Sequence, residues 1–149
     1  MLAYRDLKAI LAKVVAWEVA VNDFYDVAEL ALRNPESKKL VVALRDSHRA
    51  KLDILRTTDV RRFGSTEWVK YVPDLKDEEL LPKGKISRDS PPREVFARML
   101  ETDEKLKGFY ADVARIIVSR SQRELFESLA VFKGDQIESI KGYMASLGT

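Results

Sequence analysis

The sequence predicts an all-α protein, a four-helix bundle with one long connection between its second and third helices. Four segments space their apolar residues as amphipathic helices do, and no segment shows the sustained alternation of a strand. A short turn, a long connection and a second short turn join these segments in order. The chain has 149 residues, enough for one hydrophobic core, so we expect a single domain over 1–149.

The first half of the chain is predicted to form two long helices. The first is expected over about 3–33 and ends at the turn RNPES, because Pro35 prevents its simple continuation. The second is expected over about 36–57 and opens with Glu36 and Ser37.

The connection over 58–92 carries mixed signals and is unusually long for a link between neighbouring helices. We expect at most a short helix in it, at DLKDEELL. Two alternative roles stay open for its apolar residues: they cover the bundle, or they contact a partner chain. These residues are Trp68, Tyr71, Leu80 and Leu81.

The second half of the chain is predicted to form the other two helices. The third begins after Ser90, the expected N-cap, with Pro91 and Pro92 in its first turn, and runs to about Ser119. The fourth is expected over about 122–147.

Composition and charge exclude several classes of protein. Lysine and arginine number 26 against 24 acidic residues, so the net charge is +2, and no basic run is longer than two residues. A nucleic-acid-binding protein or a polybasic membrane anchor would show a stronger basic pattern. The absence of cysteine excludes disulfides, thiolate metal sites and cysteine nucleophiles.

Two further expectations follow from composition. The longest apolar run, VVAWEVAV, is far too short to span a bilayer, so we expect a cytoplasmic protein without a membrane partner. Asparagine and glutamine are scarce among many charged residues, which is a pattern found in proteins of thermophiles.

One carboxylate interrupts the apolar seam of the first helix, and another interrupts that of the third. In both helices a tyrosine follows two turns later: Glu18 precedes Tyr25, and Asp103 precedes Tyr110. We expect both tyrosines to be core residues whose hydroxyls reach a polar partner.

The second and fourth helices each carry a cation in the seam, followed three residues later by a histidine or a glutamine. These pairs are Arg45 with His48, and Lys133 with Gln136. A repeat of this kind between the two halves of a chain is hard to obtain from surface charges. It indicates that the polar positions of the four helices lie together at the centre of the bundle.

Outside the connection, nearly all of 5–147 resembles the ferritin-like superfamily and, within it, the rubrerythrin-like branch. The segments AWEVAVNDFYDVAELAL, VVALRDSHRAKLDIL and LFESLAVFKGDQIESI carry this resemblance. It implies a ferritin-like four-helix bundle with one crossover, association into homodimers and a diiron oxidoreductase ancestry. In this family a Glu from each of two helices and a Glu-x-x-His motif from each of the other two hold the metals.

The resemblance assigns six positions of this sequence to the metal site. Glu18 matches the Glu of the first helix, and His48 matches the His of the first motif. The other four positions depart from the family's pattern. Three of them replace a Glu, namely Arg45, Asp103 and Lys133, and the fourth, Gln136, replaces a His. The resemblance therefore implies a degenerate diiron site with no catalytic residue and no cofactor.

We expect Arg45 and Lys133 to reach Glu18 and Asp103 and to take the place of the metal charges. Two buried acids and two buried bases sum to zero, whereas an unpaired buried ion costs several kcal/mol. The predicted function is that of a non-catalytic structural or interaction protein held by a buried charge cluster of these four residues.

Two other functions stay open. Glu18, His48 and Asp103 could hold iron or another divalent metal in an oxidoreductase of peroxide, oxygen or iron chemistry. The polar centre could instead bind a small ligand, although no small-molecule substrate is identifiable.

The helical period does not decide between neighbouring seam positions. Arg45 points toward solvent if Leu44 takes the seam, and Lys133 does so if Phe132 takes it. A single histidine such as His48 is also compatible with a hydrogen-bonded core role.

The first helix carries a second apolar stripe beside its seam. A helix that is apolar on two sides usually has two sets of neighbours, so we predict a homodimer formed partly through this helix. The stripe consists of Ile10, Trp17, Ala20, Phe24, Val27 and Ala31.

Overall fold

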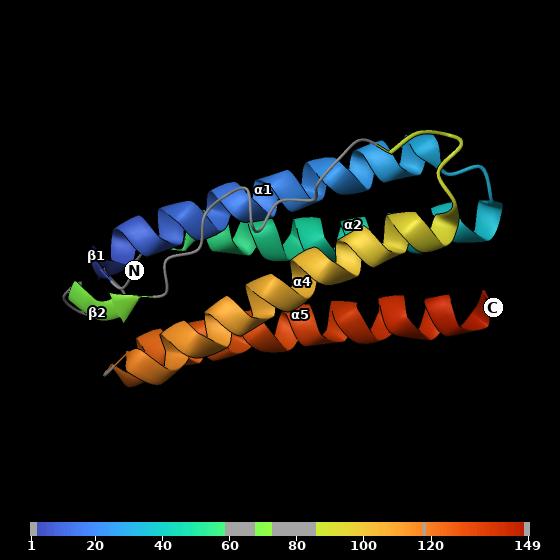
Figure 1. Ribbon diagram of the computed structural model, residues 1–149. Coiled ribbons are helices and arrows are strands. Elements are labelled where there is room, and N and C mark those ends of the chain that lie inside the picture. The colour runs from blue at the N-terminus through green and yellow to red at the C-terminus, as the bar shows by residue number, and fades with distance from the viewer. Residues whose placement is uncertain (1–2, 59–67, 73–85, 118, 148–149) are drawn as a thin grey trace.

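The computed structural model of the chain is a bundle of long helices (Figure 1). It describes residues 3–58, 68–72, 86–117 and 119–147. The elements in chain order are β1 (Ala3–Asp6), α1 (Leu7–Ala31), α2 (Pro35–Thr57), β2 (Trp68–Val72), α4 (Pro92–Ile116) and α5 (Arg120–Ser146). The prediction of an all-α bundle of four helices is confirmed, with short turns after α1 and α4.

A small two-stranded sheet was not predicted. β1 and β2 pair antiparallel, with Ala3 opposite Val72 and Asp6 opposite Trp68. The strands are only four and five residues long, too short for alternation to distinguish them from irregular chain. The rest of the predicted crossover over 58–92, including DLKDEELL, lies largely outside the described residues.

Proline and asparagine define where α2 and α4 begin. α2 begins at Pro35, and the Asn34 side chain accepts hydrogen bonds from the backbone N–H groups of Glu36 at 2.8 Å and Ser37 at 3.3 Å. α4 begins at Pro92 with Pro91 as its N-cap.

The expectation of a Ser90 N-cap for α4 was wrong. The Ser90 hydroxyl oxygen instead accepts a hydrogen bond from the backbone N–H of Ser87, at 2.9 Å, within the turn before the helix. Two consecutive prolines after Ser90 move the start of the helix one residue further along the chain.

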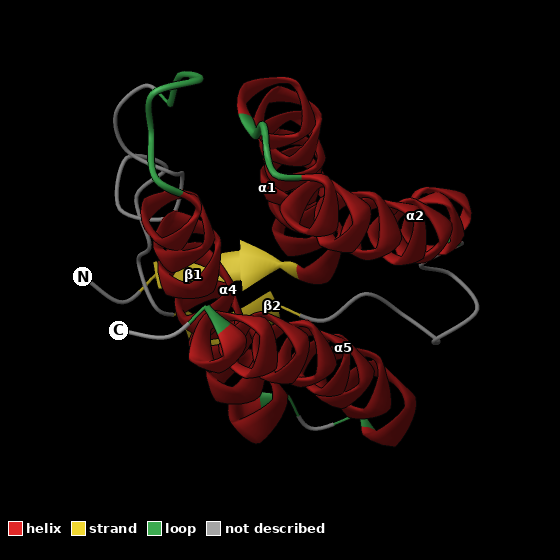
Figure 2. Ribbon diagram, turned by 90° about the vertical axis from the view of Figure 1, so that its right-hand side faces the viewer, coloured by secondary structure: helices red, strands yellow, loops and turns green. Residues whose placement is uncertain are grey.

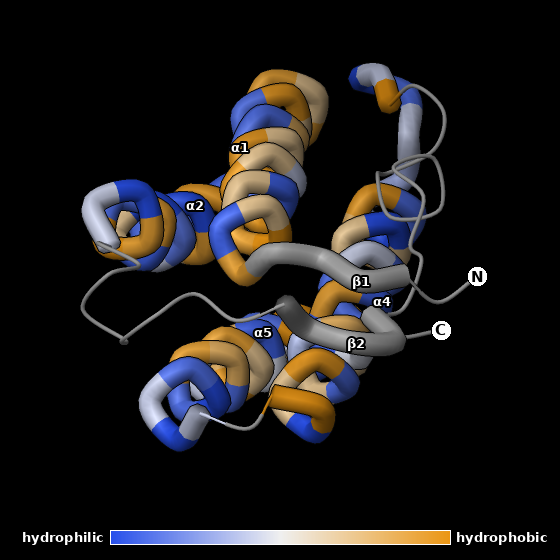
Figure 3. Tube along the Cα trace, turned by 90° about the vertical axis from the view of Figure 1, so that its left-hand side faces the viewer, coloured by the Kyte–Doolittle hydropathy of each residue, from blue (hydrophilic) through white to orange (hydrophobic). Residues whose placement is uncertain are grey.

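The helices pack as two antiparallel pairs. Seen along the bundle, α1 lies beside α2 and α4 lies beside α5 (Figure 2). Hydrophobic and hydrophilic residues alternate around each helix (Figure 3), and the apolar sides meet in a common core. Its fully buried side chains come from all four helices and include Leu7, Val14, Tyr25, Val41, Phe96, Leu106, Phe126 and Ile140. Within the described residues, no helix is both long and apolar enough to cross a membrane.

The second apolar stripe of α1 is partly covered within the chain. Ile10 and Trp17 are buried, and the Trp17 ring packs edge-on against Phe109 of α4 with 5.1 Å between ring centroids. Toward the end of α1, Val27 is 48% exposed and Leu30 is 74% exposed. A homodimer through α1 stays a prediction, and the large exposed apolar side chains of this helix, Val27 and Leu30, lie in its last two turns.

Candidate functional site

Each of the four helices places at least one polar side chain at the centre of the bundle, and four of these make up a cluster. Glu18 comes from α1, His48 from α2, Asp103 from α4 and Lys133 from α5. None of the four is more than 4% exposed. Lys133 therefore points into the core, and the alternative in which Phe132 takes its place does not hold.

Lys133 connects three helices through its amino group. Its Nζ donates to Glu18 Oε1 at 2.5 Å and to Asp103 Oδ1 at 3.2 Å. Both contacts are ion pairs between fully buried groups. An ammonium group placed between two carboxylates in this way satisfies part of the hydrogen-bonding capacity of each.

Glu18 is the most heavily contacted residue of the cluster. His48 Nε2 donates to its Oε1 at 2.9 Å, and the Tyr110 hydroxyl donates to its Oε2. Burial by itself raises the pKa of Glu18, but the charge of Lys133 and the hydrogen bond from His48 outweigh it and lower the pKa from 4.5 to about 2. Glu18 is thus ionised at neutral pH and takes up a proton only in strong acid.

The other ionisable groups of the centre respond to burial in different directions. Burial lowers the pKa of Lys133, but Glu18 and Asp103 outweigh it, so that the net pKa is raised. Burial raises the pKa of Asp103, and Lys133 only partly opposes the rise. Burial and the nearby carboxylates raise the pKa values of Tyr25 and Tyr110, so both phenols stay neutral.

Several buried polar atoms of this region have no hydrogen-bond partner among the described residues. They are the Tyr25 hydroxyl, His48 Nδ1, Asp103 Oδ2 and Gln136 Oε1. Tyr110 finds the polar partner expected for a core tyrosine, and Tyr25 does not. The Tyr25 ring instead packs edge-on against His48, at 5.4 Å between centroids.

Arg45 does not belong to the buried cluster, and the prediction that it reaches Glu18 or Asp103 was wrong. Its guanidinium pairs with Asp26 at 3.3 Å and with Glu29, both on α1, and its side chain is 16% exposed. Leu44 is buried in its place, as the alternative register allowed.

The acids of the neighbouring helix α1 explain why Arg45 lies near the surface and not in the core. α1 presents two carboxylates near the surface, where a guanidinium keeps part of its hydration and avoids the full desolvation cost of the core. Asp26 and Glu29 are three residues apart and so share one face of α1, which was the available signal in the sequence.

Without Arg45 the charge balance of the centre differs from the expected sum of zero. Glu18 and Asp103 face one ammonium group, that of Lys133, so one negative charge is left over if both acids are ionised and His48 is neutral. On balance the pKa of Asp103 is raised whereas that of Glu18 is lowered, so Asp103 is the acid of the pair that binds a proton more readily.

A second polar contact inside the bundle was not anticipated. The Ser37 hydroxyl of α2 and the Tyr143 hydroxyl of α5 form a hydrogen bond of 2.7 Å, and Ser37 is fully buried. The sequence offered no clear signal for it, because both residues are also common on solvated helix faces.

The side chains at the centre do not fit a diiron site. Lys133 Nζ lies between the two carboxylates that such a site would use, and Gln136 supplies an amide where a ligating imidazole is required. In the described part of the chain, no three His, Cys, Asp or Glu side chains are grouped so that they could hold a metal ion. The set of Glu18, His48 and Asp103 is therefore not brought together as metal ligands.

The centre also offers little room for an organic ligand. A cavity beside the cluster, lined by Glu18, His48, Lys51 and apolar residues of α2 and α5, has a volume of about 10 Å³. That is close to the space of a single water molecule.

Comparison of the chain with protein-family models, with curated proteins and with solved structures found no match. The resemblance to rubrerythrin-like proteins thus depends on the residues described above.

Proposed function

We propose that the chain is a rubrerythrin-like four-helix protein in which a buried ion-pair cluster takes the place of the metal centre. In this proposal the protein acts as a structural or interaction protein and not as an enzyme. The observation that carries it is the position of Lys133 Nζ, within hydrogen-bonding distance of both Glu18 and Asp103.

The charge and the size of the ammonium group support this proposal. A metal centre in a carboxylate-lined core supplies positive charge that holds acids from different helices together, and Lys133 supplies such a charge to α1 and α4. A divalent metal entering the same space would meet the repulsion of this fixed cation. A redox role would need ligands that the centre does not offer in a group.

Metal analysis of the purified protein tests the proposal. After expression with added iron and manganese, elemental analysis should find far less than one metal ion per chain. Stoichiometric iron or manganese that disappears in Glu18→Ala, but persists in the exposed-carboxylate control Glu127→Ala, would contradict it and favour the oxidoreductase.

A reconstruction experiment tests the relationship to the family. Lys133→Glu combined with Gln136→His restores the Glu-x-x-His motif on α5, next to Glu18, Asp103 and His48. We expect this double variant to bind iron, seen by elemental analysis and by absorbance, and the single variant Gln136→His to bind none. A folded double variant without bound iron would count against the assignment of these positions.

A further inference from the structure

The buried cluster brings one amino group and two carboxyl groups together away from bulk solvent. Lys133 Nζ lies 3.2 Å from Asp103 Oδ1 and 2.5 Å from Glu18 Oε1, and all three side chains are buried. They come from three different helices, so the fold of the chain sets these distances. An amine held this close to a carboxyl group is arranged for amide formation as well as for an ion pair.

The two acids of the cluster differ in how they are engaged. Both carboxylate oxygens of Glu18 accept hydrogen bonds, and on balance its pKa is lowered to about 2, because Lys133 and His48 outweigh the effect of burial. Burial raises the pKa of Asp103, and its Oδ2 has no hydrogen-bond partner among the described residues. An amine attacks a neutral carboxylic acid much more readily than a carboxylate. Asp103 is therefore the better electrophile, and Glu18 is the better proton acceptor.

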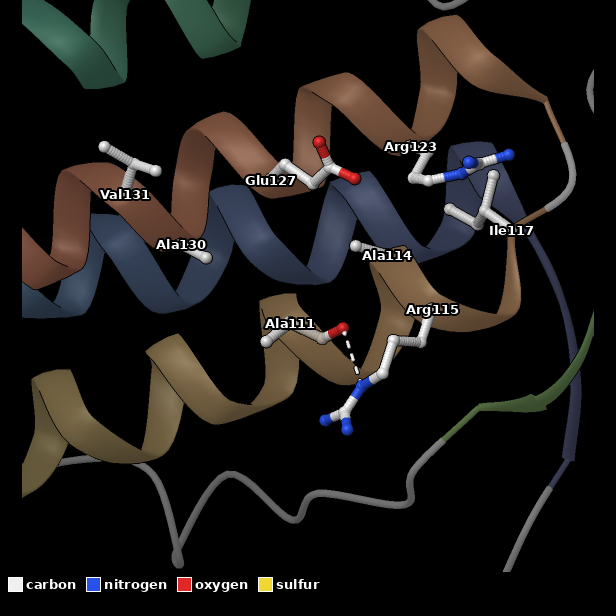
Figure 4. A pocket seen from close by; sticks show the side chains of 8 residues that line it. All are labelled: Ala111, Ala114, Arg115, Ile117, Arg123, Glu127, Ala130 and Val131. Atoms are coloured by element: carbon white, nitrogen blue, oxygen red, sulfur yellow. Dashed lines mark hydrogen bonds between the residues drawn. The ribbon is translucent and has the colours of Figure 1, made fainter.

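The helices that carry Asp103 and Lys133 are held side by side. α4 packs along α5, and Figure 4 shows alanines of both helices, Ala111 and Ala114 on α4 and Ala130 on α5, lining a groove between them. Alanines at such positions let two helices approach closely. The separation of the amine and the acid is thus set by helix packing and not by a flexible loop, which is the condition for a high effective concentration.

A second polar group lies near the electrophile. Tyr25 and Asp103 line one small cavity between α1 and α4, and the Tyr25 hydroxyl, like Asp103 Oδ2, has no hydrogen-bond partner among the described residues. Burial raises the pKa of Tyr25, so the phenol stays neutral and keeps its proton. A neutral phenol in this position can donate to a carboxyl oxygen on which negative charge develops.

We propose that Lys133 and Asp103 condense slowly to an intramolecular amide, with Glu18 as the base that moves the proton and Tyr25 as the donor to the developing oxyanion. The product cross-links α4 to α5, and the ion pair described above is its unreacted form. The inference rests on the proposed structural role of the cluster and adds a covalent modification to it. Each chain reacts once with itself, so the protein remains without an enzymatic substrate.

The steps of this condensation need no further reactant. A proton passes from the Lys133 ammonium group to Asp103 Oδ1 along their hydrogen bond, which leaves an amine and a neutral acid. The Nζ lone pair then forms a bond to the carboxyl carbon of Asp103, and Glu18 takes a proton from the nitrogen. Glu18 returns this proton to the Oδ1 hydroxyl, the bond from carbon to Oδ1 breaks, and one water molecule leaves. Nothing is oxidised or reduced, and the total charge is unchanged.

We expect the condensation to be slow, because the reactive form is scarce. Burial lowers the pKa of Lys133, but Glu18 and Asp103 outweigh it and raise the pKa, so the ammonium ion predominates. Proximity offsets this scarcity, since well-oriented neighbouring groups react with effective molarities of about 10⁵–10⁸ M.

Intact-mass spectrometry tests the inference. The chain is kept for days at a temperature at which circular dichroism shows that it is folded. We expect a growing fraction that is lighter by one water molecule, and trypsin should release residues 99–105 joined to 124–141, uncleaved after Lys133. An unchanged mass, or a cross-link to residues 14–33, which contain Glu18, would overturn the inference. An unchanged mass in a metal-free chain overturns this inference alone, whereas stoichiometric metal overturns the proposed function.

Two variants identify the reacting groups. Lys133→Arg keeps the positive charge but has no amine that can form the amide, and it also keeps every aspartate that loses water by forming a backbone imide. Its mass should stay constant, and water loss at the wild-type rate would contradict the inference. In Asp103→Asn the leaving group is ammonia, so its cross-linked product should have the same mass as the wild-type product. Loss of water from Asp103→Asn at the wild-type rate would mean that Asp103 is not the electrophile.

Two further variants test the assigned roles of Glu18 and Tyr25. Glu18→Gln removes the base with little change in shape, and it should slow the condensation by about a hundredfold or more. Tyr25→Phe removes only a donor, and it should slow the reaction by at least about tenfold. Circular dichroism confirms that both variants are folded. A folded Glu18→Gln chain that reacts as fast as the wild type would refute the mechanism.

Discussion

Lys133 carries a positive charge in the core, where its amino group contacts the carboxylates of α1 and α4. A buried pair of this kind stabilises a protein little when compared with well-packed apolar residues. Removal of one partner is different, because it leaves the other charge buried and unpaired. Arg45 provides a comparison, since its pairs with Asp26 and Glu29 lie near the surface.

We predict that Lys133→Met lowers the free energy of unfolding by about 3–5 kcal/mol, because it strands two buried carboxylates. Arg45→Met should cost only about 1 kcal/mol or less, as is usual for ion pairs near the surface. Urea denaturation of the two variants measures the difference. Equal costs would mean that Lys133 is not the buried charge that its position indicates.

A triple variant separates the stranded charge from simple loss of packing. Adding Glu18→Gln and Asp103→Asn to Lys133→Met removes every fixed charge of the cluster, so most of the lost stability should return. If the triple variant is as unstable as Lys133→Met alone, the loss comes from packing around the methionine.

The pH dependence of stability follows from Glu18. Its pKa is about 2 in the folded chain against an ordinary value of 4.5, which corresponds to roughly 3 kcal/mol. This contribution is fully present above pH 4.5 and is lost as the pH falls toward 2. We expect urea titrations between pH 6 and pH 2 (about the range of this ionisation) to show a smaller loss in Glu18→Gln than in wild type.

Asp103 contributes with the opposite sign. Its pKa is raised in the folded chain, so the folded state binds the proton more tightly and gains stability as the pH falls. Asp103→Asn removes this gain and should therefore make the loss of stability in acid steeper than in wild type. A shallower loss in Asp103→Asn would contradict the assigned direction.

At the scale of the elements, the helix ends differ in how they are capped. Asn34 accepts two backbone hydrogen bonds at the start of α2, whereas the Ser119 side chain makes no capping hydrogen bond at the start of α5. We predict that Asn34→Ala lowers the free energy of unfolding by about 1 kcal/mol. Ser119→Ala, the matched control, should change it by no more than a few tenths of a kcal/mol, and thermal unfolding measures both.

The helices were predictable because each is long and its apolar period repeats many times. Pro35 and the pair Pro91–Pro92 added local signals that located two of the helix starts to within a few residues. The strands were not predictable, because β1 and β2 are short and are stabilised by each other across a long stretch of sequence.

At the scale of the whole molecule, the centre of the bundle was predictable only in part. A carboxylate or a lysine in an otherwise apolar seam is visible in the sequence, which identified Glu18, Asp103 and Lys133. Arg45 was misplaced because adjacent residues of a helix differ by only about 100° in direction, and the period cannot rank them. The decision between Leu44 and Arg45 depends on the acids that α1 presents, which is information from another helix.

The bundle is held by bonds between residues that are far apart in the chain. The hydrogen bond from Lys133 to Glu18 spans 115 residues, and the bond from Tyr110 to the same carboxylate spans 92. During synthesis α1 leaves the ribosome first, so Glu18 has no contact with its counter-ion Lys133 until the last helix has been made. Burial of Glu18 together with its counter-ion therefore depends on completion of the polypeptide as far as α5, because Lys133 lies on that helix.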